Sequence, residues 1–163
     1  MARLFVWFSS LGIGLLVSTQ LYAKDINTIF SDTYKRFHYV SDDKQYGKDT
    51  WVDWSHRIRK NRPFWGDCDD FSVTVYNLLK EEGYNPVLYI VMLPKYSRQF
   101  DNNPVYHTVI RVNDKMLDNR YPEPREWSKG IKGSRYTLAV PYYEIAWKKR
   151  VISRSQQMRH STE

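Results

Sequence analysis

The chain of 163 residues is long enough for one domain, and its hydrophobic fraction of 42% is sufficient for a packed core. Its formal net charge is +7, but the basic residues form no regular stripe, so we interpret the charge as that of a basic soluble protein and expect no nucleic-acid partner. The single cysteine, Cys68, excludes a disulfide framework within the chain.

The first 23 residues have the pattern of a secretory signal peptide. Arg3 precedes an apolar run from Leu4 to Val17, and Ala23 supplies a small residue at the expected cleavage position. The run is shorter than the ~20 apolar residues that a membrane-spanning helix needs. We therefore predict a signal peptide at 1–23 and an exported, periplasmic body at 24–163, with membrane attachment only if the signal is not cleaved.

Two helices are predicted before the cysteine. The first covers 25–39, where apolar residues recur every three or four positions. The second begins near Asp49 or Thr50 and ends before Pro63, because the residue before a proline disfavours helical geometry. A polar loop separates the two.

A third helix begins at the stretch Gly66–Ser72, which contains the cysteine. Asp67 is suited to be its N-cap, and Gly83 is the expected stop at its C-terminal end. Its apolar stripe consists of Phe71, Val75, Leu78 and Leu79. Cys68 lies at the edge of this stripe, so its thiol is expected to point toward whatever the helix packs against.

The second half of the chain is predicted to be mainly strands, with no repeats. A stretch rich in proline and glycine interrupts them between 122 and 133, and a polar tail follows from about 153. The expected strands cover 87–92, 105–112, 115–119, 136–140 and 143–151. The chain is therefore expected to form a single α+β domain in which the cysteine helix packs on an antiparallel sheet.

A hairpin in this region brings a histidine and an aspartate together. If Asn113 and Asp114 form its turn, Val109 faces Asp118, and His107 becomes the diagonal neighbour of that aspartate on the same face. A carboxylate in this position can orient an imidazole and stabilise its protonated form. Taken singly, each of these residues also fits a purely structural role.

Cys68, His107 and Asp118 together predict a nucleophile, a base and an orienting acid. The thiol and the imidazole meet if the His107 face of the sheet is the one that packs against the helix. A helix N-terminus and a nearby imidazolium both lower the pKa of a thiol. The acids that flank the cysteine oppose this effect, and they are better explained as caps or as ligands of a cation.

The segment Gly66–Phe71 resembles the Gly-Asp-Cys-Glu-Asp-Tyr signature of the bacterial transglutaminase-like cysteine peptidases. The region of Trp51, the strand of His107 and the strand of Asp118 follow in the order of that family, and the resemblance covers roughly 25–125. It implies a papain-like or transglutaminase-like core and a catalytic triad of Cys68, His107 and Asp118.

The resemblance also implies a calcium site, because one branch of the family binds calcium through acids beside the cysteine. These acids correspond to Asp67 and Asp69, the latter replacing the usual glutamate. No organic cofactor is expected. That branch contains periplasmic proteases that cleave a biofilm adhesin, so the expected partner is a protein substrate, either a surface adhesin or another exported protein.

The main functional prediction is an exported thiol hydrolase that cleaves a protein amide through a thioester. Three alternatives remain at this point. An amine in place of water would make the protein a transglutaminase, and export with basic charge also fits a cell-wall amidase. The same scaffold could also be a non-catalytic, cation-binding interaction module, since a fold does not determine a function.

Overall fold

The fold was analysed in a computed structural model, which describes residues 23–93, 105–136 and 138–151. The predicted signal peptide, except for its last residue, lies outside these ranges, as does the predicted tail from 153. In the ranges that are described, no helix combines the length and the apolar character needed to cross a membrane.

The described residues form helices and strands in mixed order. The helices are α1 (Ile26–Tyr34), α2 (Asp42–Gln45), α3 (Ser55–Arg59), α4 (Cys68–Glu81), α5 (Trp127–Gly133) and α6 (Glu144–Lys148). The strands are β1 (Phe37–Tyr39), β2 (Phe64–Gly66), β3 (Val87–Met92), β4 (Tyr106–Val112), β5 (Lys115–Leu117), β6 (Arg125–Glu126) and β7 (Leu138–Tyr142).

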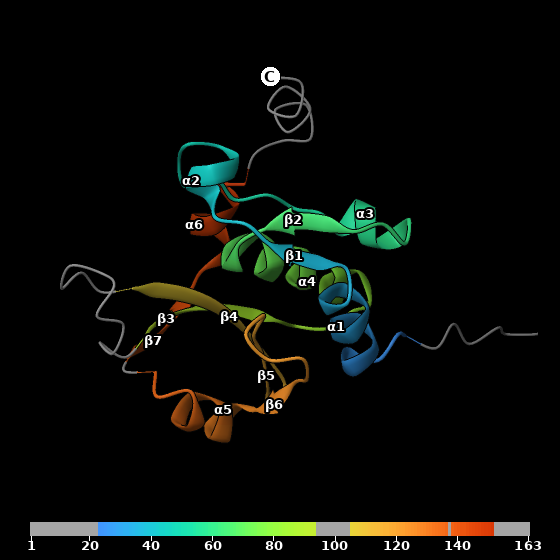
Figure 1. The fold of residues 1–163 in the computed structure, drawn as a ribbon. Helices are drawn as coiled ribbons and strands as arrows, with labels where there is room; N and C mark the ends of the chain where they lie inside the picture. The colour runs from blue at the N-terminus through green and yellow to red at the C-terminus, as the bar shows by residue number, and fades with distance from the viewer. Residues whose placement is uncertain (1–22, 94–104, 137, 152–163) are drawn as a thin grey trace, which may run out of the picture.

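A five-stranded antiparallel sheet with the order β6-β5-β4-β3-β7 is the centre of the molecule (Figure 1). Helices α4 and α1 lie over one face of this sheet, and α5 lies on its other side. Beyond α4, β1 and β2 form a small parallel pair. The predicted α+β architecture, with the cysteine helix packed on an antiparallel sheet, is confirmed.

The main core lies between α4, α1 and the α4-facing side of the sheet. The predicted stripe of α4 is buried there, with Phe71, Val75 and Leu79 fully covered. Ile110 and Val112 of β4 belong to the same core. Burial of this stripe is the main reason that the helix forms where the apolar periodicity predicts it.

The opposite face of the sheet has its own smaller core. Val91, Val109, Met116 and Tyr136 form it, with Trp127 of α5 packed against it. Because side chains alternate between the faces of a strand, residues of β4 at odd positions point to this side and those at even positions point to α4.

The predicted helix at 25–39 is correct only in its first part. Helix α1 ends at Tyr34, and the chain then turns into β1, which pairs in parallel with β2. The ring of Phe37 lies 5.4 Å from that of Phe64 and 5.0 Å from that of Phe71, measured between centroids. This aromatic packing, which joins distant parts of the sequence, outweighs the local helical periodicity.

The predicted helix from 49 or 50 is wrong over its first half, since α3 begins only at Ser55. The preceding backbone bonds to side chains of α4 instead. The N–H of Val52 donates to Asp70 Oδ1 at 2.6 Å, and that of Trp54 donates to Thr74 Oγ1 at 2.9 Å. These bonds satisfy backbone groups that a helix would otherwise have paired.

Several late elements also differ from expectation. The stretch at 122–133 contains β6 and α5, the strand expected at 136–140 is β7, and the strand expected at 143–151 is instead the short helix α6. Helix α6 carries Trp147, which is buried with its ring 4.9 Å from that of Tyr76. One large side chain thus determines how this segment docks on α4.

Candidate active site

Cys68 is the first residue of α4, and its position depends on the cap before it. Asp67 is the N-cap and accepts a hydrogen bond from the N–H of Asp69 at 3.1 Å, as the sequence predicts. On the α4 side of the sheet, Thr108 of β4 lies beside the thiol. The hydroxyl of Ser72, one turn further along α4, donates to the carbonyl oxygen of Thr108 at 3.3 Å, which ties this end of the helix to the strand.

The predicted hairpin register is confirmed. Val112 pairs with Lys115 across the turn, and Asn113 has a φ of 53°, a left-handed conformation that asparagine tolerates. His107 and Asp118 therefore share one face of the sheet. Nε2 of His107 and Oδ1 of Asp118 are 2.8 Å apart, and both side chains are buried.

Asp118 has further hydrogen-bond donors. Its Oδ1 also accepts the N–H of Arg120 at 2.9 Å, and its Oδ2 accepts the hydroxyl of Tyr136. Burial raises the pKa of this carboxyl, but the bonds from His107, Tyr136 and Arg120 together outweigh burial, so its pKa lies below the usual value. The carboxylate is thus held in its charged form beside the imidazole.

His107 lies on the face of the sheet that is turned away from α4. His107 has the parity of Val109, whose side chain lies in the core on the α5 side, whereas α4 packs on the side of Ile110. The condition under which the thiol and the imidazole would meet inside the helix–sheet interface is therefore not met. The apolar stripe of α4 does not show which face of the sheet it packs against, because that depends on which face α5 covers.

Cys68 and His107 nevertheless open onto a common pocket of about 330 Å³. Trp51, Ile90 and Tyr106 supply apolar parts of its wall. Among the hydrogen bonds of the described residues, none joins the sulfur to the imidazole. With Nε2 directed at Asp118, Nδ1 is the ring nitrogen left for other partners.

The surroundings of the thiol favour its neutral form in the protein without a bound ion. Burial of the sulfur, followed by the nearby Asp67 and Asp69, raises the pKa of Cys68 to about 12. The backbone and hydroxyl of Thr108 favour the thiolate but offset only part of this rise. A positive charge beside Asp67 and Asp69 would oppose their effect, which is the largest electrostatic contribution to the raised pKa of Cys68.

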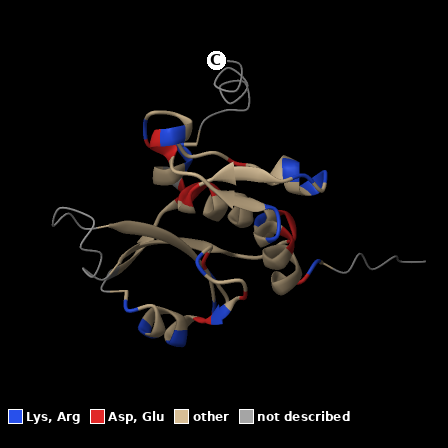
Figure 2. Cartoon of the chain, in the orientation of Figure 1, with Lys and Arg blue, Asp and Glu red and all other residues tan. Residues whose placement is uncertain are grey.

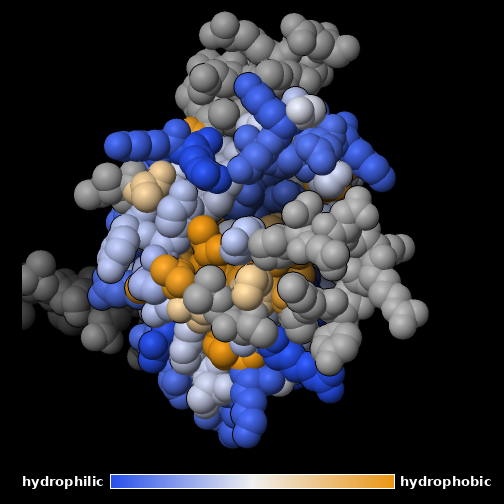
Figure 3. Space-filling model, turned by 90° about the vertical axis from the view of Figure 1, so that its left-hand side faces the viewer, coloured by the Kyte–Doolittle hydropathy of each residue, from blue (hydrophilic) through white to orange (hydrophobic). Residues whose placement is uncertain are grey.

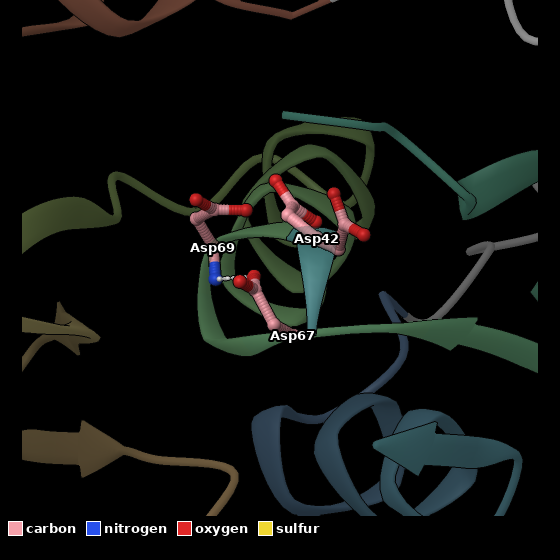
Figure 4. Close-up of side chains that lie close together, drawn as sticks. Asp42, Asp67 and Asp69 are labelled. Carbon is pink, nitrogen blue, oxygen red and sulfur yellow. Dashed lines mark hydrogen bonds between the residues drawn. The ribbon is translucent and has the colours of Figure 1, made fainter. Parts of the chain in front are cut away.

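Four aspartates form an acidic cluster next to the thiol. Asp42, Asp67, Asp69 and Asp70 each offer a carboxylate oxygen, and these oxygens all lie within 4.8 Å of one another. Figure 4 shows Asp42 of α2 beside Asp67 and Asp69 at the start of α4. The sequence predicts Asp67 and Asp69 as metal ligands but does not point to Asp42 and Asp70, which complete the acidic cluster.

The acidic cluster fits a divalent cation by two criteria. One oxygen each of Asp42, Asp69 and Asp70 is buried without a hydrogen-bond partner in the described structure. Burial, together with the neighbouring carboxylates, raises the pKa of Asp42 to about 7, that of Asp69 to about 11 and that of Asp70 well above its usual value. Carboxylate oxygens are the ligands that Ca²⁺ prefers, and a cation would supply the missing partner and charge.

Charged and apolar residues are distributed unevenly around this site. Acidic residues lie at α2, together with basic ones, and at the start of α4, and Lys and Arg also lie at α3 and around α5 (Figure 2). On the face shown in Figure 3, apolar residues gather in the middle, between hydrophilic ones. Val140 of the edge strand β7 and Tyr106 at the pocket are among the large apolar side chains that are exposed.

Comparison with solved structures gives a distant structural likeness, whereas the sequence comparisons find none. No protein-family model matches the chain, and no curated protein matches it in sequence. The fold is similar to that of LapG from Legionella pneumophila, with 18% identity and a TM-score of 0.45. The similarity covers 74% of this chain and 65% of LapG, which indicates a distant structural relationship.

Proposed function

We propose that the protein is an exported cysteine peptidase that cleaves a protein substrate, with Cys68, His107 and Asp118 as its triad. The observation that carries this proposal is the buried hydrogen bond between His107 and Asp118, with the imidazole opening onto the pocket of Cys68. The sequence resemblance to transglutaminase-like cysteine peptidases supports the same three roles. Location in the periplasm and cleavage of an adhesin or another exported protein belong to this proposal.

The proposed reaction uses the three side chains in sequence. Nδ1 of His107 takes the proton of Cys68, while Asp118 holds Nε2 and stabilises the imidazolium. The thiolate attacks the amide carbonyl carbon and forms a carbon–sulfur bond, and the N–H of Cys68 at the start of α4 is a donor for the oxyanion. His107 then protonates the leaving amine, and water hydrolyses the thioester.

The acidic cluster is the proposed calcium site. Asp42, Asp67, Asp69 and Asp70 would hold the ion, which would supply positive charge next to the thiol. Its expected effect is to reduce the rise in the pKa of Cys68 that Asp67 and Asp69 cause.

A labelling experiment tests the triad without knowledge of the substrate. We expect iodoacetamide to modify Cys68 in the calcium-loaded protein faster than it modifies free glutathione at neutral pH. His107→Ala should slow this reaction by roughly tenfold or more, because it removes the base. His38→Ala is the matched control, since His38 stacks on Trp65 and has no part in the His107–Asp118 hydrogen bond.

Cleavage is tested by comparing exported proteins of cells that produce the wild type with those of cells that produce Cys68→Ala. A fragment present only with the wild type identifies the substrate. Labelling that is no faster than that of glutathione, and unchanged by His107→Ala, would contradict the proposed catalysis.

A second candidate function is a non-catalytic, cation-binding module. The high pKa of Cys68 and the unpartnered carboxylate oxygens favour it. The two functions differ in the response of the thiol to calcium. A peptidase should be labelled at Cys68 faster with calcium than with EDTA, whereas a module should bind calcium with slow labelling under both conditions.

Calcium binding itself is expected to depend on the acidic cluster. Titration calorimetry should detect binding to the wild type, and Asp69→Asn should weaken it at least tenfold by removing one charged ligand. Asp43→Asn is the matched control, because Asp43 lies next to Asp42 on α2 but is exposed and outside the acidic cluster. Equal affinity in all three proteins would contradict the proposed site.

A further inference from the structure

We propose that Tyr136, which follows the end of α5, is a positioning residue for Asp118. The inference rests on the proposed function, because it explains how the orienting acid of the triad is itself held. Tyr136 belongs to none of the motifs that predict the site. It reaches the site from the far side of the sheet.

The first argument is the set of bonds around the carboxylate. Tyr136 is 9% exposed, and its hydroxyl donates to Oδ2 of Asp118. The other oxygen, Oδ1, receives Nε2 of His107 and the N–H of Arg120. Tyr136 is thus the donor that occupies the second oxygen, and it prevents the carboxylate from rotating away from the imidazole.

The second argument is the way the chain places the phenol. After α5 and its cap Ser134, Arg135 adopts a φ of 56°, and the N–H of Tyr136 returns to the carbonyl of Ile131 at 3.3 Å. This left-handed step ends the helix and turns the next side chain under the sheet. A non-glycine residue in this conformation is uncommon, which indicates that the turn is specified rather than incidental.

The third argument is that the hydroxyl of Tyr136 takes part in two hydrogen bonds, both with charged side chains. Nη1 of Arg120 donates to the hydroxyl oxygen of Tyr136 at 3.3 Å, and its guanidinium lies 5.7 Å from the centre of the ring. Burial and the adjacent Asp118 raise the pKa of Tyr136, so the phenol stays protonated and remains a donor. A purely apolar role would be filled equally well by phenylalanine.

The test removes the hydroxyl alone, with Tyr136→Phe. The main readout is the carboxyl titration of Asp118, followed by carbon NMR in a Cys68→Ala background. The groups that face this carboxyl are His107, Arg120 and the phenol. Loss of a donor to the charged form should move the titration upward by about one pH unit. In the active protein, labelling of Cys68 should slow about three- to tenfold.

Tyr121→Phe is the matched control. Its hydroxyl bonds to Oγ of Ser134 at 3.0 Å, so it ties the same segment but does not touch Asp118. The control should leave both readouts at wild-type values. Thermal unfolding of both variants shows whether the fold is retained.

The outcomes separate this inference from the proposed function. An unchanged Asp118 titration in Tyr136→Phe, or an equal shift in Tyr121→Phe, overturns the positioning role even if the protein cleaves its substrate. Failure of His107→Ala to slow labelling of Cys68 overturns the triad instead. The carboxyl titration then still decides whether Tyr136 holds Asp118.

Discussion

At the scale of single residues, Gly66 shows how tightly the candidate site is packed. A Cβ at this position would lie 2.6 Å from Cβ of Asp70 and closer still to its Oδ2. Asp70 cannot give way easily, since its Oδ1 is bonded to the N–H of Val52. The glycine before the cysteine is therefore required by the close approach of the buried carboxylate.

The expected result of Gly66→Ala is a loss of about 1–3 kcal/mol in the free energy of unfolding, from overpacking. Urea denaturation measures it. Gly133→Ala in α5 is the matched control, because its added Cβ would meet nothing closer than the guanidinium of Arg125 at 3.9 Å. Equal stability of the two variants would show that Asp70 can move and that the contact is not restrictive.

At the scale of elements, the segment before α3 illustrates a backbone held by side chains. The N–H of Trp54 depends on the hydroxyl of Thr74, which is fully buried on α4. Thr74→Val keeps the shape of the side chain but leaves this N–H without its partner. We expect a loss of about 1–3 kcal/mol in the free energy of unfolding, measured by urea denaturation.

Thr33→Val provides the comparison for this prediction. Thr33 is equally buried, but its hydroxyl donates to the carbonyl of Ile29 within α1, which can keep its helical hydrogen bond. Thr33→Val should lower the free energy of unfolding by less than half as much as Thr74→Val. The prediction is wrong if the two substitutions cost the same.

The same elements show what local sequence can and cannot predict. The hairpin register follows from Asn113 and Asp114, so the pairing of His107 with Asp118 is predictable from neighbours in the chain. The start of α3 is not predictable in this way, because the backbone before it forms hydrogen bonds with side chains of α4 in place of helical ones. Local periodicity fails where distant side chains compete for the backbone.

The residues of the candidate site also differ in whether local sequence can predict them. Cys68, Asp67 and Asp69 lie together in one short motif, and sequence alone identifies them. Asp42 and Tyr136 join the site from α2 and from the end of α5, and only the folded chain shows their proximity.

At the scale of the whole molecule, the acidic cluster links stability to pH and to calcium. In the folded protein without metal, burial first and the neighbouring carboxylates second raise the pKa of Asp42 to about 7 and that of Asp69 and Asp70 above their usual values. The folded state therefore binds more protons than the unfolded state. By linkage, the free energy of unfolding falls as pH rises from about 4 through 7 and beyond.

In EDTA, thermal unfolding should consequently occur at a higher temperature at pH 5 than at pH 8. Saturating calcium should raise the unfolding temperature mainly at pH 8, where the carboxylates are charged and bind the ion, and so flatten the dependence of the unfolding temperature on pH.

Asp42→Asn should weaken the pH dependence of the unfolding temperature in EDTA, because it removes one of the carboxyls that hold an extra proton in the folded state. Asp43→Asn should change this dependence much less than Asp42→Asn, since Asp43 is exposed, lies outside the acidic cluster and is the smallest of the causes that raise the pKa of Asp42. An unfolding temperature that rises from pH 5 to pH 8 in EDTA would mean that Asp42, Asp69 and Asp70 are not held together as buried carboxyls, and the case for a cation at this site would fail with it.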